Sequence, residues 1–503
     1  MRSGSGRVVS NATMTLLRLS FFALAMAPAA LSQQAGDVID VGSRRELFVD
    51  RSLIDDLVGA RLELARPRDE GVALRFDRSW EGPFCGYSTV IADGERYLLY
   101  YRGLPKAGGD GTNLERTCVA VSSDGRRFER PELSRFEVAG AATNNVVLAD
   151  AAPVSHNFSP FLDARVRGES PHRFKALGGN ERSGLIAYSS ADGISWTLFH
   201  AEPVLRGAEF DSQNVAFWSG LEQCYVCYMR SWTGDGYAGI RTVSRATSKD
   251  FVTWTEPQEM GFRDGLGALE HLYTNQTHPY MRAPHIYVGI AARFLPGRQV
   301  LSASDAKQLG VNPKYFRDCS DAVLLTSRGG LSYDRTFREA FLRPGVGLQN
   351  WVSRSNYPAC NVVQTGPAEM SFYVNQNYAQ PTAELRRYSL RLDGFASLRA
   401  GFEGGQARTR PLRFTGAQLE LNFATSAAGS VRVALCAQDG SALAGYGLED
   451  CLPLIGNDIS RRVTWRRKGA ATSDVSEHEG RVVRLRFELV DADLYAMQFA
   501  GER

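Results

Sequence analysis

Three kinds of feature are scarce in this sequence, and each scarcity excludes a class of protein. Beyond the N-terminus, no stretch approaches the roughly twenty consecutive apolar residues that cross a membrane. No basic run alternates with aromatic residues, and 58 Lys and Arg nearly balance 55 Asp and Glu, which argues against a nucleic-acid partner. With only seven histidines, one of them among other polar residues is weak support for a metal, so we predict none.

The N-terminus differs from the rest of the chain. The run MTLLRLSFFALAMAPAALSQQ, residues 14–34, places a basic residue before an apolar stretch that ends in small residues. This order is typical of a secretory signal peptide. We therefore predict that residues 1–33 are removed, that the true start is Met14, and that the mature protein is periplasmic or extracellular, with no membrane span.

Eight cysteines follow the predicted signal peptide. Cys224 and Cys227 form a C-x-x-C motif, but it lies in a strand pattern, where residues three apart point to opposite faces. A zinc or redox site is therefore not expected there, and buried free thiols explain most of the cysteines. Because an exported chain can form disulfides, we expect Cys436 and Cys451 to be the favoured pair.

One short motif returns along the chain, each time after an apolar, strand-like run. It combines turn residues with an aromatic or apolar residue a few positions later. The copies are SSDGRRFER at Ser122, SADGISWTL at Ser190, TSKDFVTWTEP at Thr247, TSRGGLSYDR at Thr326 and a weaker RLDGFASLR at Arg391. Copies about 60 to 80 residues apart, with strand patterns between them, predict a propeller or an array of similar units.

Each of the five periods contains four strand-like segments, and helical patterns are nearly absent. The sequence therefore predicts an all-β fold: a five-bladed β-propeller followed by a C-terminal antiparallel β-sandwich. The recurrent motif is then the turn between the third and fourth strands of a blade. Its aromatic residues are expected to pack between blades: Phe128, Trp196, Trp254 and Tyr333.

The same patterns divide the mature chain into parts. Residues 37–75 are expected to pack on the propeller or to close its ring, and residues 76–400 to form the propeller. GQARTRPLRF, residues 405–414, resembles a linker. Residues 408–503 alternate apolar and polar side chains without a copy of the repeat, which favours a separate sandwich.

Five segments should converge where the inner strands of the blades begin, at one mouth of the central channel. They contain the carboxylates Glu81, Asp211 and Glu270, which we predict to be catalytic. Glycoside hydrolysis needs one carboxyl group to protonate the leaving oxygen and another to activate water or attack carbon. Each residue also has a structural alternative. Glu81 could cap a turn, Asp211 could form one, and only one of Glu270 and His271 can face the channel.

Other polar and aromatic residues of these segments are expected to bind the substrate or to support the carboxylates. The expected substrate-binding residues are Trp80, Tyr87, His156, Asn157, Gln213, Asn214, His271, Tyr273, Trp351, Arg354, Asn356 and Tyr357. The expected supporting residues are Arg102, Arg230 and Asp163, of which the arginines could lower the pKa of a neighbouring carboxyl group. No cofactor is expected, although the channel could hold a structural calcium ion.

The sequence resembles five-bladed propeller glycoside hydrolases of the superfamily that includes families 32 and 43. TSKDFVTW is similar to their turn between third and fourth strands. RRELFVDRSLI, EGPFCGYSTV, FDSQNVAFW and NWVSRSNYPA further resemble exported proteins of planctomycete-type bacteria that are labelled glycosyl hydrolases. The family 32 motifs W-M-N-D-P-N-G and R-D-P are missing, so this resemblance implies the fold more firmly than the residue roles.

The resemblance implies an exported glycoside hydrolase, exo-acting on a plant- or algal-type glycan. Its partner would be an oligo- or polysaccharide, and the oligomeric state stays open. Two alternatives from other classes remain: a non-catalytic propeller that binds glycans at the same mouth, and a structural protein of the cell envelope with an occluded mouth. A carboxylate pair at hydrolase spacing would favour the enzyme.

Overall fold

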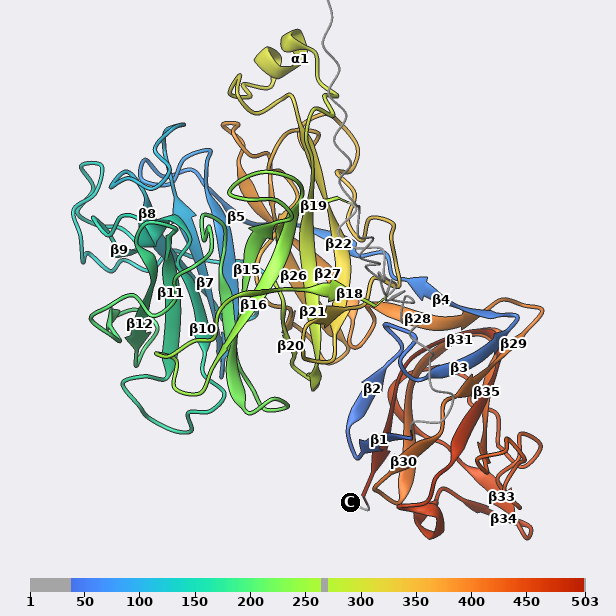
Figure 1. Cartoon of the computed structure of the whole chain (residues 1–503). Helices are drawn as coiled ribbons and strands as arrows, with labels where there is room; N and C mark the ends of the chain where they lie inside the picture. The colour runs from blue at the N-terminus through green and yellow to red at the C-terminus, as the bar shows by residue number, and fades with distance from the viewer. Residues whose placement is uncertain (1–37, 264–269, 502–503) are drawn as a thin grey trace, which may run out of the picture. The chain divides into compact units, whose positions relative to one another are not determined.

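A computed structural model describes residues 38–263 and 270–501 (Figure 1). The predicted signal peptide lies outside these residues. Within them the chain is almost entirely β-strand, with one short α-helix, α1 (Ala303–Gln308), and two 3-10 turns, η1 (Val154–His156) and η2 (Ser476–His478). In the same residues, no helix has the length and apolar character needed to cross a membrane. The all-β prediction is confirmed.

The first three blades are four-stranded antiparallel sheets in which neighbours in sequence are also neighbours in the sheet. Blade 1 consists, from the channel outward, of β6 (Gly86–Asp93), β7 (Arg96–Gly103), β8 (Arg116–Ser122) and β9 (Val146–Leu148). Blade 2 consists of β10 (Ser159–Leu162), β11 (Phe174–Asn180), β12 (Gly184–Ser190) and β13 (Thr197–Leu198). Blade 3 consists of β14 (Val215–Ser219), β15 (Cys224–Trp232), β16 (Arg241–Ser248) and β17 (Gln258–Glu259).

In blades 4 and 5 the inner strand is interrupted. In blade 4, β19 (His271–Thr274) and β20 (His278–Tyr280) both pair with β21 (Ala283–Leu295), which pairs with β22 (Cys319–Ser327). In blade 5, β24 (Tyr357–Pro358) and β25 (Val363–Gln364) both pair with β26 (Glu369–Gln376), which pairs with β27 (Glu384–Arg391). A short parallel pair, β18 (Gly261–Phe262) and β23 (Ser332–Tyr333), joins the chain after blade 3 to the chain after β22.

The fourth strand of blade 5 comes from the other end of the propeller sequence. It is β5 (Arg68–Arg75), which precedes blade 1 and runs antiparallel to β27. Its hydrogen bonds to β27 join the first and last parts of the ring and cover an edge that would otherwise be open. The N-terminal segment thus contributes a strand to the ring, and that strand is Arg68–Arg75.

The recurrent turn takes its shape from a serine and an aspartate. In the second copy, Ser190 Oγ donates to Asp192 Oδ1 (2.9 Å) and accepts from the N–H of Gly193 (2.9 Å). Asp192 Oδ1 also accepts from the two backbone N–H groups that follow Gly193, at 2.7 Å each. The same pattern recurs at Ser122–Asp124 and Ser248–Asp250. The motif is therefore repeated because each blade needs the same tight turn.

Three of the four motif aromatics pack against the second strand of a neighbouring blade. The ring pairs, with their centroid separations, are Phe128 with Tyr373 (5.5 Å), Trp196 with Tyr100 (6.0 Å) and Tyr333 with Tyr228 (5.8 Å). Tyr100 and Tyr373 also donate their hydroxyl hydrogens to backbone carbonyls of the adjacent turns. The fourth, Trp254, packs on Phe251 of its own turn at 5.6 Å. These aromatics therefore hold blades and turns together rather than bind a ligand.

The fifth copy of the motif does not lead into an outer strand. Its aspartate, Asp393, is fully buried and accepts hydrogen bonds from Tyr280 (2.8 Å) and Asn422 (2.9 Å). Arg45 and Arg282 pair with the same carboxylate at 3.3 and 3.2 Å. The chain continues into β28 (Ala396–Ala400), which belongs to the C-terminal sheet. The copy is weaker in sequence because its turn ends the propeller.

The C-terminal part is built on two long antiparallel strands, β31 (Gln418–Cys436) and β35 (Arg484–Ala500). Around them lie β2 (Arg45–Leu47), β3 (Ile54–Val58), β4 (Ala60–Leu64), β28, β29 (Gly405–Thr409) and β32 (Asn457–Arg462). Two further pairs are β1 (Ile39–Gly42) with β30 (Leu412–Phe414) and β33 (Trp465–Arg467) with β34 (Ala470–Thr472). The N-terminal segment therefore adds strands to both the sandwich and the propeller.

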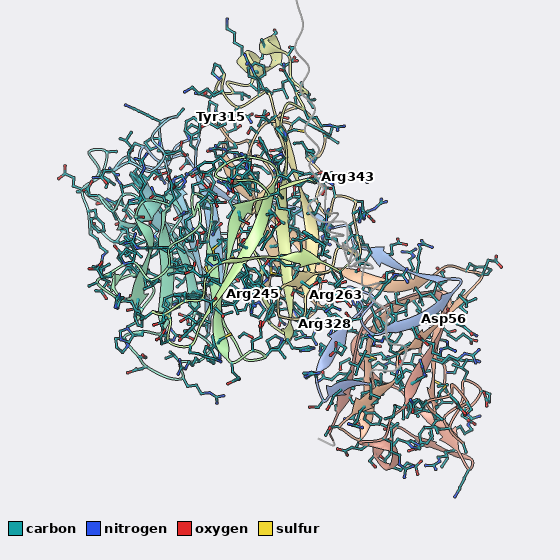
Figure 2. The ribbon with its side chains drawn as sticks, in the orientation of Figure 1. Asp56, Arg245, Arg263, Tyr315, Arg328 and Arg343 are labelled. Carbon is teal, nitrogen blue, oxygen red and sulfur yellow. The ribbon has the colours of Figure 1, made fainter. Side chains whose placement is uncertain are left out.

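Two expectations about this part differ from the structure. The stretch 405–414, expected as a linker, forms β29 and β30, because its alternating side chains pack into the sandwich core. The expected Cys436–Cys451 disulfide is absent: all eight cysteines are described, and all are buried free thiols. Cys451 Sγ instead accepts the N–H of Val433 at 3.3 Å. On the propeller side, Arg328, which follows β22, pairs with Glu46 and Asp50 (Figure 2).

Candidate active site at the mouth of the propeller

The antiparallel order of each blade decides which residues reach the mouth, meaning the end of the channel where the inner strands begin. One residue from the head of each inner strand lines a single cavity there: Tyr87, His156, Asp211, Tyr273 and Arg354. The cavity has a volume of about 350 Å³. The structure thus brings together five of the residues predicted from the strand heads, one from each blade.

Hairpin loops supply the rest of the wall. The second strand of each blade ends at the mouth, so the loop to the third strand lies there as well. The loops of blades 1, 2 and 3 place Asp110, Glu181 and Tyr237 in the cavity wall. Sequence reasoning missed these three because it considered only the strand heads. The available signal was topological: every loop between second and third strands lies at this end.

Arg102 organises the deep side of the cavity in blade 1. Its Nη1 lies 3.3 Å from Asp110 Oδ1, 3.2 Å from Glu115 Oε1 and 3.1 Å from His156 Nδ1. Burial alone would raise the pKa of Asp110, but the guanidinium groups of Arg102 and Arg354 outweigh it and lower that pKa. Asp110 is therefore an anion at neutral pH.

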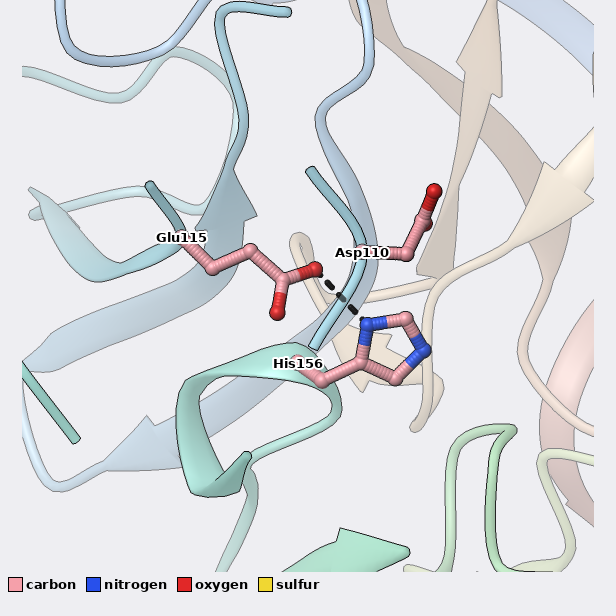
Figure 3. A group of neighbouring side chains, drawn as sticks. All are labelled: Asp110, Glu115 and His156. Carbon is pink, nitrogen blue, oxygen red and sulfur yellow. Dashed lines mark hydrogen bonds and ion pairs between the residues drawn. The ribbon is translucent and has the colours of Figure 1, made fainter. Parts of the chain in front are cut away.

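Glu115 and His156 form a buried pair next to the cavity (Figure 3). Glu115 is fully buried, and its Oε1 lies 2.7 Å from His156 Nδ1. The other ring nitrogen, Nε2, lies 3.2 Å from the backbone oxygen of Asp211. The contact with the Glu115 carboxylate fixes the orientation of the imidazole ring. It also sets whether the other ring nitrogen donates or accepts a hydrogen bond.

The side chains of Asp110, Glu115 and His156 are close enough to suggest a metal site, since their ligand atoms lie within 4.8 Å of one another. Arg102 Nη1 contacts a ligand atom of all three, however, so a cationic nitrogen already occupies the space between them. Calcium also prefers six to eight oxygen ligands. This trio therefore suits an internal arginine and does not fit a metal ion.

Asp211 is the predicted catalytic carboxylate that the structure places in the cavity. Its side chain is 36% exposed and forms an ion pair with Arg230, whose own side chain is 3% exposed. Two fully buried asparagines, Asn157 and Asn214, fix the loop that carries Asp211. Both donate hydrogen bonds to the backbone oxygens of Phe210 and Ser212. Asn157 and Asn214 therefore position Asp211 and do not face the cavity.

Tyr273 is surrounded by cations. The guanidinium carbons of Arg230, Arg241 and Arg354 lie 4.7, 5.0 and 5.7 Å from its ring centroid. Burial raises the pKa of Tyr273, but Arg354 and Arg230 outweigh burial, and the net pKa lies below the usual tyrosine value. The Tyr357 ring lies 5.1 Å from it and closes the deep side.

Glu81 lies elsewhere. It is fully buried and accepts hydrogen bonds from Tyr101 (2.5 Å) and from Arg130, at 2.7 Å from Nε and 2.8 Å from Nη2. It also accepts the N–H of Arg78 at 3.1 Å, which is the turn-capping alternative considered for this residue. Neighbouring Trp80 donates to Asn145 (2.9 Å) within the core of blade 1. Neither residue lines the mouth cavity.

Glu270 is also outside the cavity wall. Its carboxylate pairs with Arg293 (3.1 Å) and Arg335 (2.6 Å), and these guanidinium groups outweigh burial to lower its pKa. His271 beside it accepts from the backbone N–H of Arg241 at 3.2 Å. Asp163 is buried with Lys175 and Tyr225. The structure therefore gives the three predicted catalytic carboxylates three separate sets of partners and places only Asp211 at the cavity.

The remaining predicted binding residues stabilise the propeller through hydrogen bonds and packing. Gln213 donates to Thr89 (2.9 Å) and accepts from Gln276 (2.7 Å) inside the channel. Asn356 is fully buried and donates to the backbone oxygens of Ser320 and Asn350 at 2.9 Å. Trp351 packs against an apolar cluster that includes Tyr315. Tyr315 lies on the loop that carries α1 (Figure 2).

No protein-family model and no curated protein sequence matches the chain. Solved structures align with it at low similarity. One is an N-acetylgalactosamine deacetylase from F. plautii in complex with blood group B trisaccharide, with 13% identity, 66% of this chain and 96% of that chain covered, and a TM-score of 0.42. A second is a glycosyl hydrolase from Bacteroides ovatus, with 14% identity, coverages of 65% and 93%, and a TM-score of 0.35.

A third comes from the GH130 family of mannoside phosphorylases, described as containing glycoside hydrolases that target β-1,2 mannosidic linkages in Candida mannan. It has 15% identity, coverages of 69% and 96%, and a TM-score of 0.35. With TM-scores of 0.42 or less, these similarities carry no argument about activity.

Proposed function

We propose that this protein is an exported glycoside hydrolase that removes units from the ends of a plant- or algal-type oligo- or polysaccharide. The observation that carries the proposal is the mouth cavity, where Asp110, Glu181 and Asp211 stand beside the rings of Tyr87 and Tyr273. Its volume of about 350 Å³ is near the lower limit for ligand pockets. Such a cavity suits a terminal sugar better than the middle of a long chain.

The three carboxylates have different surroundings, which supports different roles. Asp211 forms an ion pair with Arg230 and faces the cavity, so we assign it as the base or nucleophile. Glu181 is exposed and interacts with Tyr237, and we assign it as the acid. Asp110 is kept anionic by Arg102 and would stabilise positive charge on the sugar ring.

In this mechanism the bond between the anomeric carbon and the leaving oxygen breaks. Glu181 gives its proton to that oxygen. In the direct route, Asp211 takes a proton from the water whose hydroxyl group the anomeric carbon receives. In the two-step route, Asp211 first bonds to the anomeric carbon, and water then displaces it while Glu181 takes the proton of the water. The two carboxyl groups must differ in proton affinity for this to work. Glu181 lies beside Tyr237, and Asp211 forms an ion pair with Arg230.

A second candidate is a propeller that binds a glycan without cleaving it. It is favoured by the fact that Asp110 and Asp211 are both tied to largely buried arginines, Arg102 and Arg230. Such pairs can serve hydrogen bonding to sugar hydroxyls as well as catalysis.

The test compares carboxylates in the cavity with one that the structure places outside it. The purified protein is screened against nitrophenyl glycosides and against plant and algal polysaccharides, and released monosaccharides are measured. We expect Asp211→Asn to lower kcat by about 10²- to 10⁴-fold on all substrates, as loss of an essential carboxylate does. Glu181→Gln should lower kcat strongly on natural oligosaccharides and much less on nitrophenyl glycosides, whose leaving group needs little protonation.

Glu270→Gln and the exposed Glu95→Gln are the comparison variants, and both should keep wild-type kcat per folded molecule. A large loss in Glu270→Gln with none in Asp211→Asn would contradict this assignment of the site. Wild-type turnover in both Asp211→Asn and Glu181→Gln, or glycan binding without any product, would favour the binding-only function.

A further inference from the structure

Positive charge exceeds negative charge on one side of the mouth. Arg230 is paired with Asp211, but within residues 38–263 and 270–501 no carboxylate forms an ion pair with Arg241 or Arg354. Arg241 Nη1 contacts only a neutral acceptor, His271 Nδ1 at 3.2 Å. Arg354 is half-buried and lines the mouth cavity. These two half-buried cations lie near Asp110 and Asp211 but form no ion pair with a described carboxylate, so they keep donor capacity for a ligand.

A small recess shares two lining residues, Tyr87 and Arg354, with the mouth cavity. The recess has a volume of about 20 Å³ and is lined by Gly86, Tyr87, Arg102, Arg354, Tyr357, Asn375 and Tyr378. Tyr378 Oη lies 3.5 Å from both Arg102 Nη2 and Arg354 Nη1. Two guanidinium groups therefore face a space that holds about one water-sized group.

Some hydrogen-bond donors around the recess have an acceptor in the protein and others do not. Arg102 Nη2 donates to the backbone oxygen of Phe84 at 3.0 Å. Guanidinium groups only donate hydrogen bonds. The hydroxyl of Tyr357 is buried and has no hydrogen-bond partner among the described residues, and the whole residue is 9% exposed. Asn375 uses its amide nitrogen on the backbone oxygen of Cys85 at 2.7 Å. The Tyr357 hydroxyl and Arg102 Nε are thus donors without a partner among the described residues, and a group that accepts hydrogen bonds would suit this recess.

The electrostatic field around Tyr273 also favours an anion near these arginines. Burial raises the pKa of that phenol, yet Arg354 and Arg230 overcome the effect and leave the net pKa lowered. The same field that favours a phenolate favours any anion placed between these arginines.

We infer that the recess binds the carboxylate of a uronic acid, so that the substrate is an acidic glycan. This rests on the proposed function for the bond that is cleaved, but binding of the acidic sugar does not require cleavage. A carboxylate is planar, and its two oxygens match the donor fork of Arg354. The recess holds about one water-sized group, so one carboxylate oxygen would enter it while the other faces the Arg354 side of the mouth cavity.

Binding is tested by calorimetry with sugars that the enzyme does not cleave. Glucuronate and galacturonate are compared with glucose and galactose, and glucuronate with its methyl ester, which keeps the shape and loses the charge. We expect the free acids to bind at least about 10-fold more tightly, as charge-assisted hydrogen bonds allow. The preference should weaken with added salt because it is electrostatic.

Variants then locate the binding group. Arg354→Gln should abolish the preference for the acid, Arg354→Lys should keep part of it, and Tyr357→Phe should weaken it by a smaller factor. Arg343→Gln, at an exposed arginine outside the cavity wall, should leave it unchanged (Figure 2). Circular dichroism melting shows whether each variant is folded. If Arg354→Gln does not fold, Arg354→Lys tests the proposal in its place.

The outcomes separate this inference from the proposed hydrolase activity. If the protein prefers the acid in a way that depends on Arg354 but cleaves no substrate, the acid-binding site is supported and the hydrolase activity is contradicted. Cleavage of neutral glycosides that depends on Asp211, with equal binding of glucuronate and its methyl ester, keeps the hydrolase and overturns the acid site. Tighter binding of a sulfated sugar than of glucuronate also overturns it.

Discussion

At the residue scale, the surroundings of a carboxyl group decide its role more than its residue type does. Glu81 and Asp211 both precede an inner strand, yet Glu81 is fully buried against Tyr101 and Arg130 while Asp211 opens into the mouth. A buried carboxylate with three donors is satisfied and holds blade 1 together. A half-exposed one with a single arginine has acceptor capacity left for a substrate.

His278 gives a prediction at this scale. Its Nδ1 lies 2.8 Å from the backbone oxygen of Gln276, and its Nε2 accepts the N–H of Val362 at 3.1 Å, so the folded protein needs the neutral ring. Burial lowers its pKa from 6.5 to about 4. Between pH 6.5 and pH 4 the unfolded chain therefore binds the extra proton and the folded protein does not, so stability falls as the pH falls.

The full loss below pH 4 should be about 3 kcal/mol. It is measured as the free energy of unfolding in urea across this pH range. His278→Gln, whose amide can replace both hydrogen bonds without titrating, should flatten that part of the profile. His200→Gln, at a half-exposed histidine, should keep the wild-type slope. An unchanged slope in His278→Gln would show that other groups cause the acid loss.

At the scale of elements, the repeated turn is the local structure that is easiest to recognise in the sequence. Serine and aspartate satisfy backbone N–H groups that a tight turn leaves without partners, and a motif aromatic anchors the turn to its surroundings. The hydrogen bonds are local, but the aromatic contact reaches the next blade. The turns that carry Phe128, Trp196 and Tyr333 therefore reverse the chain and also join neighbouring blades.

Asp192→Ala should destabilise the protein by about 1–2 kcal/mol, because two backbone N–H groups and the Ser190 hydroxyl lose their acceptor. Burial raises the pKa of Asp192, but these hydrogen bonds outweigh it and lower the net pKa, so its contribution is lost as the pH falls through that lowered value. Urea unfolding measures the effect, with the exposed Glu95→Ala as control. An equal change in both variants would mean that the turn bonds are not responsible.

At the scale of the whole molecule, the chain enters and leaves the propeller through the sandwich. Strands β1–β4 belong to sandwich sheets, β5 closes blade 5, and β28 returns to the sandwich. Asp393 lies at this return and joins Arg45 of β2, Arg282 near β21 and Asn422 of β31. A single carboxylate therefore ties both parts of the chain.

Asp393→Ala should cost about 3–5 kcal/mol, because it leaves the buried Arg45 and the half-buried Arg282 without their anion. We expect the loss to appear as a single transition shifted to lower temperature in calorimetry. Asp55→Ala, at an exposed carboxylate of β3, is the control and should cost less than about 1 kcal/mol. A normal melting temperature for Asp393→Ala would show that this contact does not couple the two parts.

The fold could be predicted because its information is local and repeated. The Ser-x-Asp turns, period-two strands and motif aromatics each report their own element, and five similar periods together imply a ring. The strand heads at Tyr87, His156 and Arg354 could be placed at one mouth for the same reason. The closing strand β5 was foreseen only as lying somewhere in residues 37–75, since its partner β27 is more than three hundred residues away.

The candidate site was decided by the tertiary structure. Asp110 and Glu181 reach the cavity from hairpin loops, and nothing in their local sequence distinguishes them from ordinary turn residues. Glu81 and Glu270 lie near strand heads, yet Arg130 and Arg335 bind them away from the cavity wall. Turn and strand preferences act within a few residues, whereas the charge balance of a site depends on which distant side chains packing brings within a few ångström.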